Sequence, residues 1–529
     1  METIELDKLG YTQKHENFSN LKKEIDSTLF KAQNSGYIDA EIFEIKKLND
    51  SVTEAILYLR EKFNHIKLNY SLNEAERKQL KNLALTIEEN YFIIPIYNID
   101  KILNQLILYR TEKGEAFSSI KLINISKEKD ELTAELDINV TKARTIDGIK
   151  INGYEKFPSA FLKHYLKIKK GQLYNSQKIT SQSNKISNIA FASQIKPPEV
   201  LFTADSTVVH LYIKKENNNS FEGFLGFSNS EEKKLTFTGD LKLQLQNNLN
   251  YGEKLNIRYK SDGNDQINFN AQVDLPYILN FPIGVNLALD IFKQDSSYIN
   301  IEQIFKIRYN ISNSISSYLG YRSTTSTSLK EENMDFGNFE DFKSHFYSLG
   351  GTYQNLVTEN RMVPIQTLIS IDFATGKRNS GNNEIQQQKI EFQAAHNFYI
   401  NEKNSVYIGN ISSILFSEEY LENELFRFGG INSIRGFAEN SLRANRFSAL
   451  QTEYRYFLSP DLYINSIFDL AYFKSPSFNH NMNLYSFGIG FALSTKSGLL
   501  KANIANGRTE GESFQFSKSK IHLSLSVHF

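Results

Sequence analysis

The second half of the chain alternates apolar and polar residues in long runs, and this pattern restricts the fold more than any other feature. In INFNAQVDL, residues 267–275, the apolar side chains fall on the odd positions and Asn, Gln and Asp on the even ones. LKLQLQ at 241–246 and IHLSLSVHF at 521–529 have the same period of two, which places successive side chains on opposite faces of a β-strand. From about residue 220 onward, about sixteen such segments follow one another without a helical pattern between them.

These segments are longer than the strands of most water-soluble domains. Several exceed about ten residues, whereas about five or six is usual, and about 9–11 residues suit a tilted transmembrane strand with one apolar and one polar face. A β-propeller would show a blade repeat, and a soluble β-sandwich would use more than the nine prolines of this chain. We therefore predict a mainly β fold, with residues 218–529 as a 16-stranded antiparallel transmembrane β-barrel. The terminal Phe529 fits a last strand that closes the barrel by pairing with the first.

The region before the barrel mixes helical and strand patterns. Three segments each end in two strands around a short polar turn, at 35–61, 114–140 and 190–215. Their spacing of about 80 residues indicates repeated small domains. We expect these domains at 1–62, 63–142 and 143–217.

The third repeat shows its elements most fully. It has a strand at 147–153, helices at 158–167 and 176–189, and then two strands, in the order β-α-α-β-β. The first repeat shows one helix fewer, so we expect it to be incomplete. Amphipathic helices are also expected at 20–33 and at 73–90.

Composition excludes several functions. Sixty basic and sixty acidic residues leave no net charge, so a nucleic-acid partner has no support. Without cysteine there is no disulfide framework, no thiolate metal site and no cysteine nucleophile. The nine histidines include no HExxH arrangement, and neither a phosphate-binding loop nor a nucleophile elbow is present. We expect no enzyme activity, no metal and no cofactor.

The N-terminus and the apolar runs bear on export and membrane insertion. METIELDKLG is charged and no apolar segment follows it, so this numbering contains no signal peptide; if the protein is exported, we expect the signal to have been removed. The longest apolar run, YFIIPIY at 91–97, is far too short for a transmembrane helix.

A glycine-rich segment, FRFGGINSIRGFAEN at 426–440, contains one internal arginine, Arg435. An arginine in a loop is most often solvated. Strand parity suggests otherwise, because Asp469 and Glu453 each lie on the side of their strand opposite the apolar residues and would face the lumen. We therefore predict that Arg435 holds the loop inside the barrel by pairing with Asp469 or Glu453.

The β-α-α-β-β repeats, the long-stranded barrel, the tripeptide Arg435-Gly436-Phe437 before the last strands and the terminal Phe together resemble the outer-membrane assembly and secretion superfamily of BamA, TamA and the two-partner secretion transporters. The resemblance covers nearly the whole chain and implies periplasmic POTRA repeats before a sixteen-stranded barrel. It also implies that the loop arginine contacts a Phe-x-Asp-x-Gly motif in the wall. Here that motif reads Ile467-Phe468-Asp469-Leu470-Ala471, in which only the aspartate matches.

The resemblance implies an outer-membrane insertase or translocase of a Gram-negative bacterium. Its POTRA domains, in the periplasm, would receive unfolded client chains by β-augmentation, and the barrel would insert or export them. The layout is most like TamA; a two-partner secretion transporter of one passenger and a passive or structural barrel are the alternatives. The implied partners are client polypeptides, the bilayer with its lipopolysaccharide, and envelope subunits.

The resemblance also implies a weakly paired seam between the first and last strands. On the first strand Gly223 and Gly226 would weaken packing, although they could equally serve to bend the strand, and Phe529 would lie on the other side.

Overall fold

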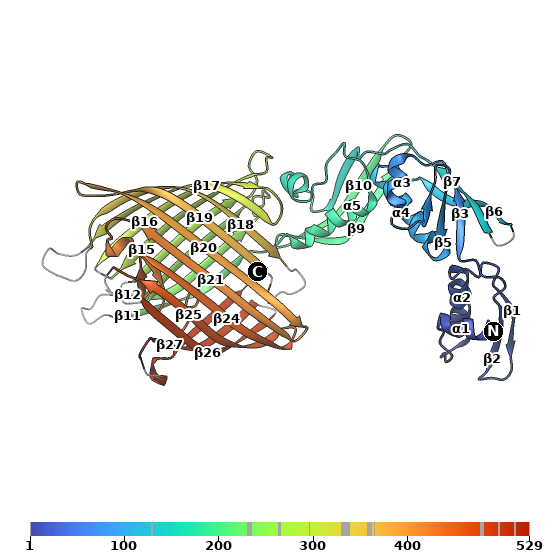
Figure 1. The fold of residues 1–529 in the computed structure, drawn as a ribbon. Coiled ribbons are helices and arrows are strands. Elements are labelled where there is room, and N and C mark those ends of the chain that lie inside the picture. The colour runs from blue at the N-terminus through green and yellow to red at the C-terminus, as the bar shows by residue number, and fades with distance from the viewer. Residues whose placement is uncertain are drawn as a thin grey trace. The chain divides into compact units, whose positions relative to one another are not determined.

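The computed structural model describes residues 2–128, 131–229, 235–262, 266–295, 297–329, 339–356, 362–363, 365–476, 481–495, 498–512 and 515–527. The chain forms two compact units (Figure 1). One consists of Met1–Lys150, Lys169–Ser181 and Glu199–His210, and the other of Ile151–Ile168, Gln182–Pro198 and Leu211–Phe529. The expected boundaries at 62, 142 and 217 stay predictions.

A 16-stranded sheet makes up most of the second unit, and each strand pairs antiparallel with the next (Figure 1). The prediction of a mainly β fold with sixteen barrel strands is therefore confirmed. The strands are β11 (Ser220–Asn229), β12 (Leu235–Gln246), β13 (Lys254–Asp262), β14 (Ile267–Leu275), β15 (Ile283–Gln294), β16 (Tyr298–Asn310), β17 (Ile315–Ser328), β18 (Phe342–Leu356), β19 (Ile365–Ser380), β20 (Asn383–Asn401), β21 (Asn404–Phe416), β24 (Arg446–Ser459), β25 (Leu462–Lys474), β26 (Met482–Thr495), β27 (Gly498–Thr509) and β28 (Lys520–Val527).

The connection between β21 and β24 has structure of its own. It contains the short helix η4 (Glu422–Glu424) and a separate two-stranded hairpin of β22 (Phe426–Phe428) and β23 (Leu442–Ala444). A short helix, η5 (Phe516–Lys518), lies between β27 and β28.

Burial in the large sheet is inverted relative to a water-soluble protein. Leu319, Tyr347 and Ile489 have more than half of their surface exposed, whereas Asp372 and Arg378 are buried. An exposed apolar outer face and a polar inner face are typical of a barrel that meets lipid outside and encloses a polar lumen.

The first repeat contains α1 (Glu2–Leu9), α2 (Phe18–Asn34), β1 (Glu41–Lys47) and β2 (Thr53–Tyr58). Leu6 and Leu9 of α1 and Leu29 of α2 pack around buried Ala32 and Leu59. The expectation that this repeat lacks a helix is wrong, because both helices are present. What distinguishes it is a sheet with two strands among the described residues.

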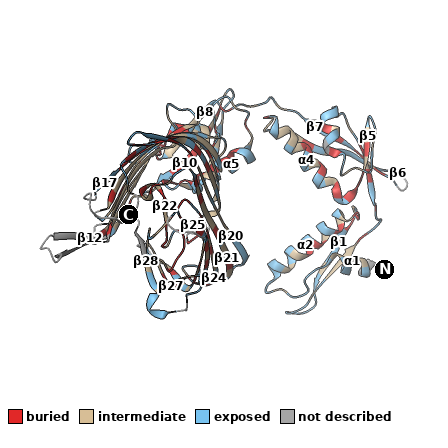
Figure 2. Cartoon of the chain, turned by 60° about the vertical axis from the view of Figure 1, so that its left-hand side comes forward, coloured by how far each residue is buried: buried red, intermediate tan, exposed pale blue. Residues whose placement is uncertain are grey.

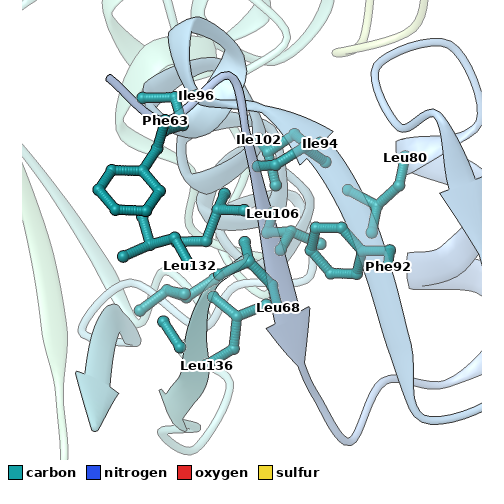
Figure 3. Packing of buried hydrophobic residues seen from close by; sticks show 13 residues of the cluster. Phe63, Leu68, Leu80, Phe92, Ile94, Ile96, Ile102, Leu106, Leu132 and Leu136 are labelled. Atoms are coloured by element: carbon teal, nitrogen blue, oxygen red, sulfur yellow. The ribbon is translucent and has the colours of Figure 1, made fainter. Parts of the chain in front are cut away.

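The second repeat contains a sheet of order β4-β5-β3-β7-β6. Its elements are β3 (His65–Asn69), α3 (Glu74–Leu80), β4 (Thr86–Ile87), β5 (Tyr91–Pro95), η1 (Ile96–Asn98), α4 (Ile99–Glu112), β6 (Ser119–Glu128) and β7 (Glu131–Asn139). Buried Ile102 and Leu106 of α4 pack against Leu68, Phe92 and Leu132 of the sheet (Figure 3), and burial falls on one side of the helix (Figure 2).

The expected helix at 73–90 is wrong beyond Leu80. Asn73 and Glu76 form a capping box that starts α3, as the local sequence favours. The residues that follow α3 then turn back and pair with β5, where Leu85 N donates to Ile93 O at 2.8 Å. This pairing overrides the helical pattern.

The third repeat follows the predicted order β-α-α-β-β. It contains β8 (Gly148–Gly153), a π-helical turn η2 (Phe161–Tyr165), α5 (Ser176–Asn184), η3 (Lys185–Asn188), β9 (Ala192–Phe202) and β10 (Thr207–Lys215), with sheet order β8-β10-β9. In the part of the chain that the structure describes, no helix has both the length and the apolarity to cross a membrane.

Candidate functional site

The lumen loop, which we define as residues 417–445, packs against the inner face of the barrel wall. Phe428 and Ile434 are buried against Ala449, Ala471 and other apolar side chains of β24 and β25. The loop is therefore not a solvated surface segment.

A tight turn at Gly429-Gly430 directs the loop toward the wall. Both glycines have positive φ, +109° and +93°, which residues with side chains rarely adopt. Gly429 N donates to Ser433 Oγ at 2.7 Å, and Gly430 N donates to Ile434 O at 3.0 Å. The turn thereby places Ile434 and Arg435 against the strands.

Arg435 contacts both carboxylates that parity predicts to face inward. Its Nε lies 2.8 Å from Asp469 Oδ2, its Nη2 lies 2.5 Å from Asp469 Oδ1, and its backbone N donates to Oδ2 at 3.0 Å. Its Nη1 donates to Glu453 Oε1. Arg435 is 2% exposed and Asp469 0%. Arg435 thus contacts two strands, β25 through Asp469 and β24 through Glu453. That these contacts anchor the loop in the working protein stays a prediction.

A second arginine balances the charge of this cluster. Arg455, on the same strand as Glu453, donates to Glu453 Oε2 at 2.6 Å and to Asn397 Oδ1 at 2.7 Å. Two guanidinium groups therefore face two carboxylates. Removing one partner would leave an uncompensated buried charge, at a cost of about 3–5 kcal/mol.

Gly436 and Phe437 lie against the last strands. Gly436 has φ +83°, and a Cβ there would collide with the backbone of Gly507 on β27. The Phe437 ring covers the same Gly507, and Gly436 N makes a long hydrogen bond of 3.5 Å to His522 Nε2 on β28. The tripeptide is therefore fitted to β27 and β28 as well as to Asp469.

The departures from the wall motif are accommodated by packing. Ile467 and Ala471 are both buried, and Ala471 belongs to the apolar cluster beneath Phe428 and Ile434. Ala471 carries one methyl group more than the glycine of the motif, and this methyl group packs within the cluster. Asp469 keeps its contacts although its neighbours differ.

A second buried ion pair holds the start of the lumen loop, and sequence reasoning missed it. Arg378 Nη1 on β19 donates to Glu424 Oε1 at 2.6 Å, and Gln387 Nε2 on β20 donates to Glu424 Oε2 at 2.9 Å. The side chains of Arg378 and Glu424 are 3% and 4% exposed. The alternation of β19 could have placed Arg378 inward, but nothing in the sequence names a partner 46 residues away.

Further contacts bind the same part of the loop to β15, β16 and β17. Asn423 Nδ2 donates to Ser326 Oγ at 2.7 Å, and Asn300 Nδ2 donates to Asn423 O at 2.7 Å. The Arg427 guanidinium carbon lies 3.4 Å from the centre of the Phe292 ring. The lumen loop is thus attached to well-separated parts of the barrel wall.

The first and last strands of the sheet meet at a seam. Cα atoms of β11 and β28 come within 8 Å of one another, but among the described residues no ladder of hydrogen bonds joins these strands. The closure by β-pairing that the terminal residues suggest is therefore not seen in that part of the chain. Phe529 itself lies outside the described residues.

The two seam glycines differ in their surroundings. Gly223 has φ +156°, and a Cβ there would meet Asp240 O and the Leu241 side chain of β12. Gly226 pairs with Thr238 in the regular ladder. Close approach to β12 thus explains Gly223, and a role of either glycine in weakening the seam stays a prediction.

Residues 151–168 pack on the turns at one end of the barrel, within the second unit. The rings of Phe161 and Tyr277 meet edge to face, with their centroids 5.0 Å apart. The Phe161 ring also packs against Gly252, where an added Cβ would collide with it. His164 stacks on Tyr277 and contacts Asn280 O through Nε2 at 2.6 Å. Burial raises the pKa of Tyr277 to about 12. The turns at 247–253 and 276–282 therefore form the contact surface for residues 151–168.

Comparison with known families and sequences gives one match. Residues 144–215 match the family model POTRA, described as a surface antigen variable number repeat. This range falls on the segment in which the third repeat is expected. No curated protein sequence matches the chain.

Solved structures match over nearly the whole chain. BamA from Haemophilus ducreyi lacking POTRA domains 1–3 has a TM-score of 0.54 at 14% identity, covering 88% of this chain and 99% of that one. CdiB from Acinetobacter baumannii has a TM-score of 0.53 at 13% identity, covering 97% of each chain. CdiB from Escherichia coli has a TM-score of 0.53 at 13% identity, covering 96% of this chain and 97% of that one. The chain therefore shares the fold of these BamA and CdiB structures, and the predicted resemblance is confirmed at the level of the fold.

Proposed function

We propose that the chain is an outer-membrane insertase or translocase of a Gram-negative bacterium, in which periplasmic POTRA domains receive client polypeptides and the barrel inserts or exports them. The seam between β11 and β28 carries this proposal. A strand without a paired neighbour offers a row of backbone donors and acceptors, to which a client strand can add with little demand on its sequence.

The second repeat offers a receiving edge for the client. β6 lies at the edge of its sheet and exposes Ile123 and Ile125. One of the two edge strands of the third repeat, β9, contains Pro197 and Pro198, which lack the N–H that a strand addition needs. We therefore assign client capture to β6 ahead of β9.

Crosslinking in cells tests the proposal. A photo-crosslinking residue is placed at Phe221 on β11 or at Leu523 on β28, both exposed on the apolar face beside the seam. Leu319 on β17, which is equally apolar and 65% exposed, is the matched control away from the seam. We expect nascent outer-membrane proteins to be trapped from positions 221 and 523 and not from 319. Absence of a client at both seam positions, or equal trapping at 319, would contradict insertase action.

A two-partner secretion transporter is the second candidate, because the CdiB structures match nearly all of this chain and of their own. Leu6 and Leu9 of α1 pack in the core of the first repeat, which argues against α1 serving as a helix that plugs the barrel. Deletion of the gene distinguishes the two. Loss of one secreted passenger, with other outer-membrane proteins unchanged, would favour the transporter, and wide, steady conductance without a client phenotype would favour a passive pore.

A further inference from the structure

The lumen loop touches both sides of the seam. On one side, Gly436 and Phe437 lie against β27 and β28, as described above. On the other side, Glu439 forms an ion pair with Lys260 of β13. Because β13 is joined through β12 to β11 by continuous ladders, Lys260 moves with the first strand of the barrel.

We propose that the Glu439–Lys260 ion pair is a latch that holds the seam closed. This inference rests on the proposed function, because it concerns the opening of the same seam. Separation of β11 from β28 must carry Lys260 away from the Arg435–Phe437 segment of the loop, which lies against β24, β25, β27 and β28. The ion pair must break for the two sides to part.

Neighbouring groups position both ends of the latch. A Cβ at Gly430 would meet the backbone and side chain of Glu439, so the Gly429-Gly430 turn packs directly on this residue. Lys260 lies opposite Asp240 on β12, and Asp240 pairs with Arg258 at 2.9 Å. Because Asp240 pairs with Arg258, Lys260 pairs with Glu439 of the loop instead.

The two attachments of the loop differ in how easily they release. The side chains of Arg435 and Asp469 are 3% and 0% exposed, whereas those of Lys260 and Glu439 are 34% and 33% exposed. Ion pairs that water reaches are weak and screened by salt, and buried pairs are costly to break. The loop therefore stays on β24 and β25 while the Lys260 contact releases.

The other ion pairs of the lumen loop do not cross the seam. Arg378–Glu424 and Arg443–Glu422 attach or stabilise its first part, near β19 and β20 or within the loop itself. Of the loop's ion pairs in the described residues, Glu439–Lys260 alone reaches β11, β12 or β13.

Distance measurement across the seam tests the latch. The chain has no cysteine, so spin labels at Phe221→Cys and Leu523→Cys attach to β11 and β28 alone. Pulsed electron paramagnetic resonance on the full chain in a bilayer, without client, gives the fraction of molecules with a long label separation. We expect Lys260→Glu to raise this fraction about twofold to fivefold, as for loss of a solvent-exposed ion pair. Exchange of the charges in K260E/E439K should restore the original distribution.

The matched control is Lys242→Glu. Lys242 pairs with Glu222 at 3.6 Å, and both residues lie on the same side of the seam, on β12 and β11. This variant makes the same charge change without touching the latch, so its distances should equal those of the parent. High salt should widen the parent distribution and narrow that of K260E, because it screens both the parent ion pair and the repulsion between the introduced carboxylate and Glu439.

Three outcomes would overturn the latch: an unchanged distribution in K260E, no recovery in the charge exchange, or an equal effect of K242E. The measurement contains no client and so is independent of the crosslinking experiment. Failure to trap a client together with a working latch would reject the proposed function alone.

Discussion

Arg435 and Asp469 meet in a two-point contact, with Nε 2.8 Å from Oδ2 and Nη2 2.5 Å from Oδ1, and both side chains are buried. Paired hydrogen bonds of this kind fix the orientation of a guanidinium as well as its position. The lumen loop is therefore held in one orientation on β25, and Glu453 adds a second strand to the contact.

Substitution of Arg435 tests the energy of this contact. Arg435→Ala leaves Asp469 buried without its partner, so we expect the free energy of unfolding to fall by about 3–5 kcal/mol. Arg435→Lys keeps the charge but not the two-point geometry, so its free energy of unfolding should lie between those of the parent and R435A. Chemical unfolding in a bilayer measures both. A value for R435A within about 0.5 kcal/mol of the parent, the range of an ordinary surface substitution, would show that the contact does not stabilise the barrel.

Gly436 tests the fit of the loop to β27. Gly436→Ala requires a residue with a side chain at φ +83° and brings its Cβ against the backbone of Gly507. Gly511→Ala is the matched control, since Gly511 has φ +85° and nothing within 4 Å of the added atom. We expect G511A to lower the unfolding free energy by about 1–2 kcal/mol, the cost of left-handed backbone alone, and G436A to lower it further. Equal losses in the two variants would argue against close packing at Gly436.

Glu424 tests the attachment at the start of the loop. Glu424→Gln leaves the buried Arg378 without a counter-charge, and we expect a loss of about 3–5 kcal/mol in unfolding free energy. Glu384→Gln is the control: Glu384 on β20 pairs at 2.6 Å with Lys377, the neighbour of Arg378 on β19, but both side chains are more than half exposed. E384Q should change stability by no more than about 1 kcal/mol. A similar small effect of E424Q would mean that burial does not strengthen the pair.

Tyr277 makes the packing of residues 151–168 sensitive to alkali. Burial raises its pKa to about 12, above the ordinary value of about 10. The neutral phenol is the form that the folded state favours, so its contribution is complete below about pH 10 and is lost as the pH rises through about 12. Because the chain contains no tryptophan, the emission of F161W reports on this contact. We expect the emission of F161W to change near pH 12 and that of F161W/Y277F not to change there. The same change in both proteins would assign the transition to another group.

Local patterns were sufficient to predict the strands and the side on which each charge lies. Alternation has a period of two within a single strand, so it predicted β14 and β25 and placed Asp469 in the lumen without knowledge of any neighbour. It could not choose between Asp469 and Glu453, because they lie on adjacent strands and Arg435 reaches both.

Pairing over long distances in the sequence could not be predicted. The residues after Leu80 have a helical spacing, yet Leu85 bonds to Ile93 because β5 offers an edge. Likewise the polarity of Arg378 was visible in the sequence, but its partner Glu424 is set by the path of the lumen loop. In each case the deciding interaction belongs to the assembled structure.

The attachments of the lumen loop also have a mechanical consequence. A barrel without an apolar core has no packed interior to resist a change in its cross-section. Here the loop acts as an internal strut between β19, where Glu424 pairs with Arg378, and β25, so the wall is stiff along that line. The barrel wall is therefore most easily deformed at the seam between β11 and β28, and thermal fluctuations of the barrel diameter will be largest there.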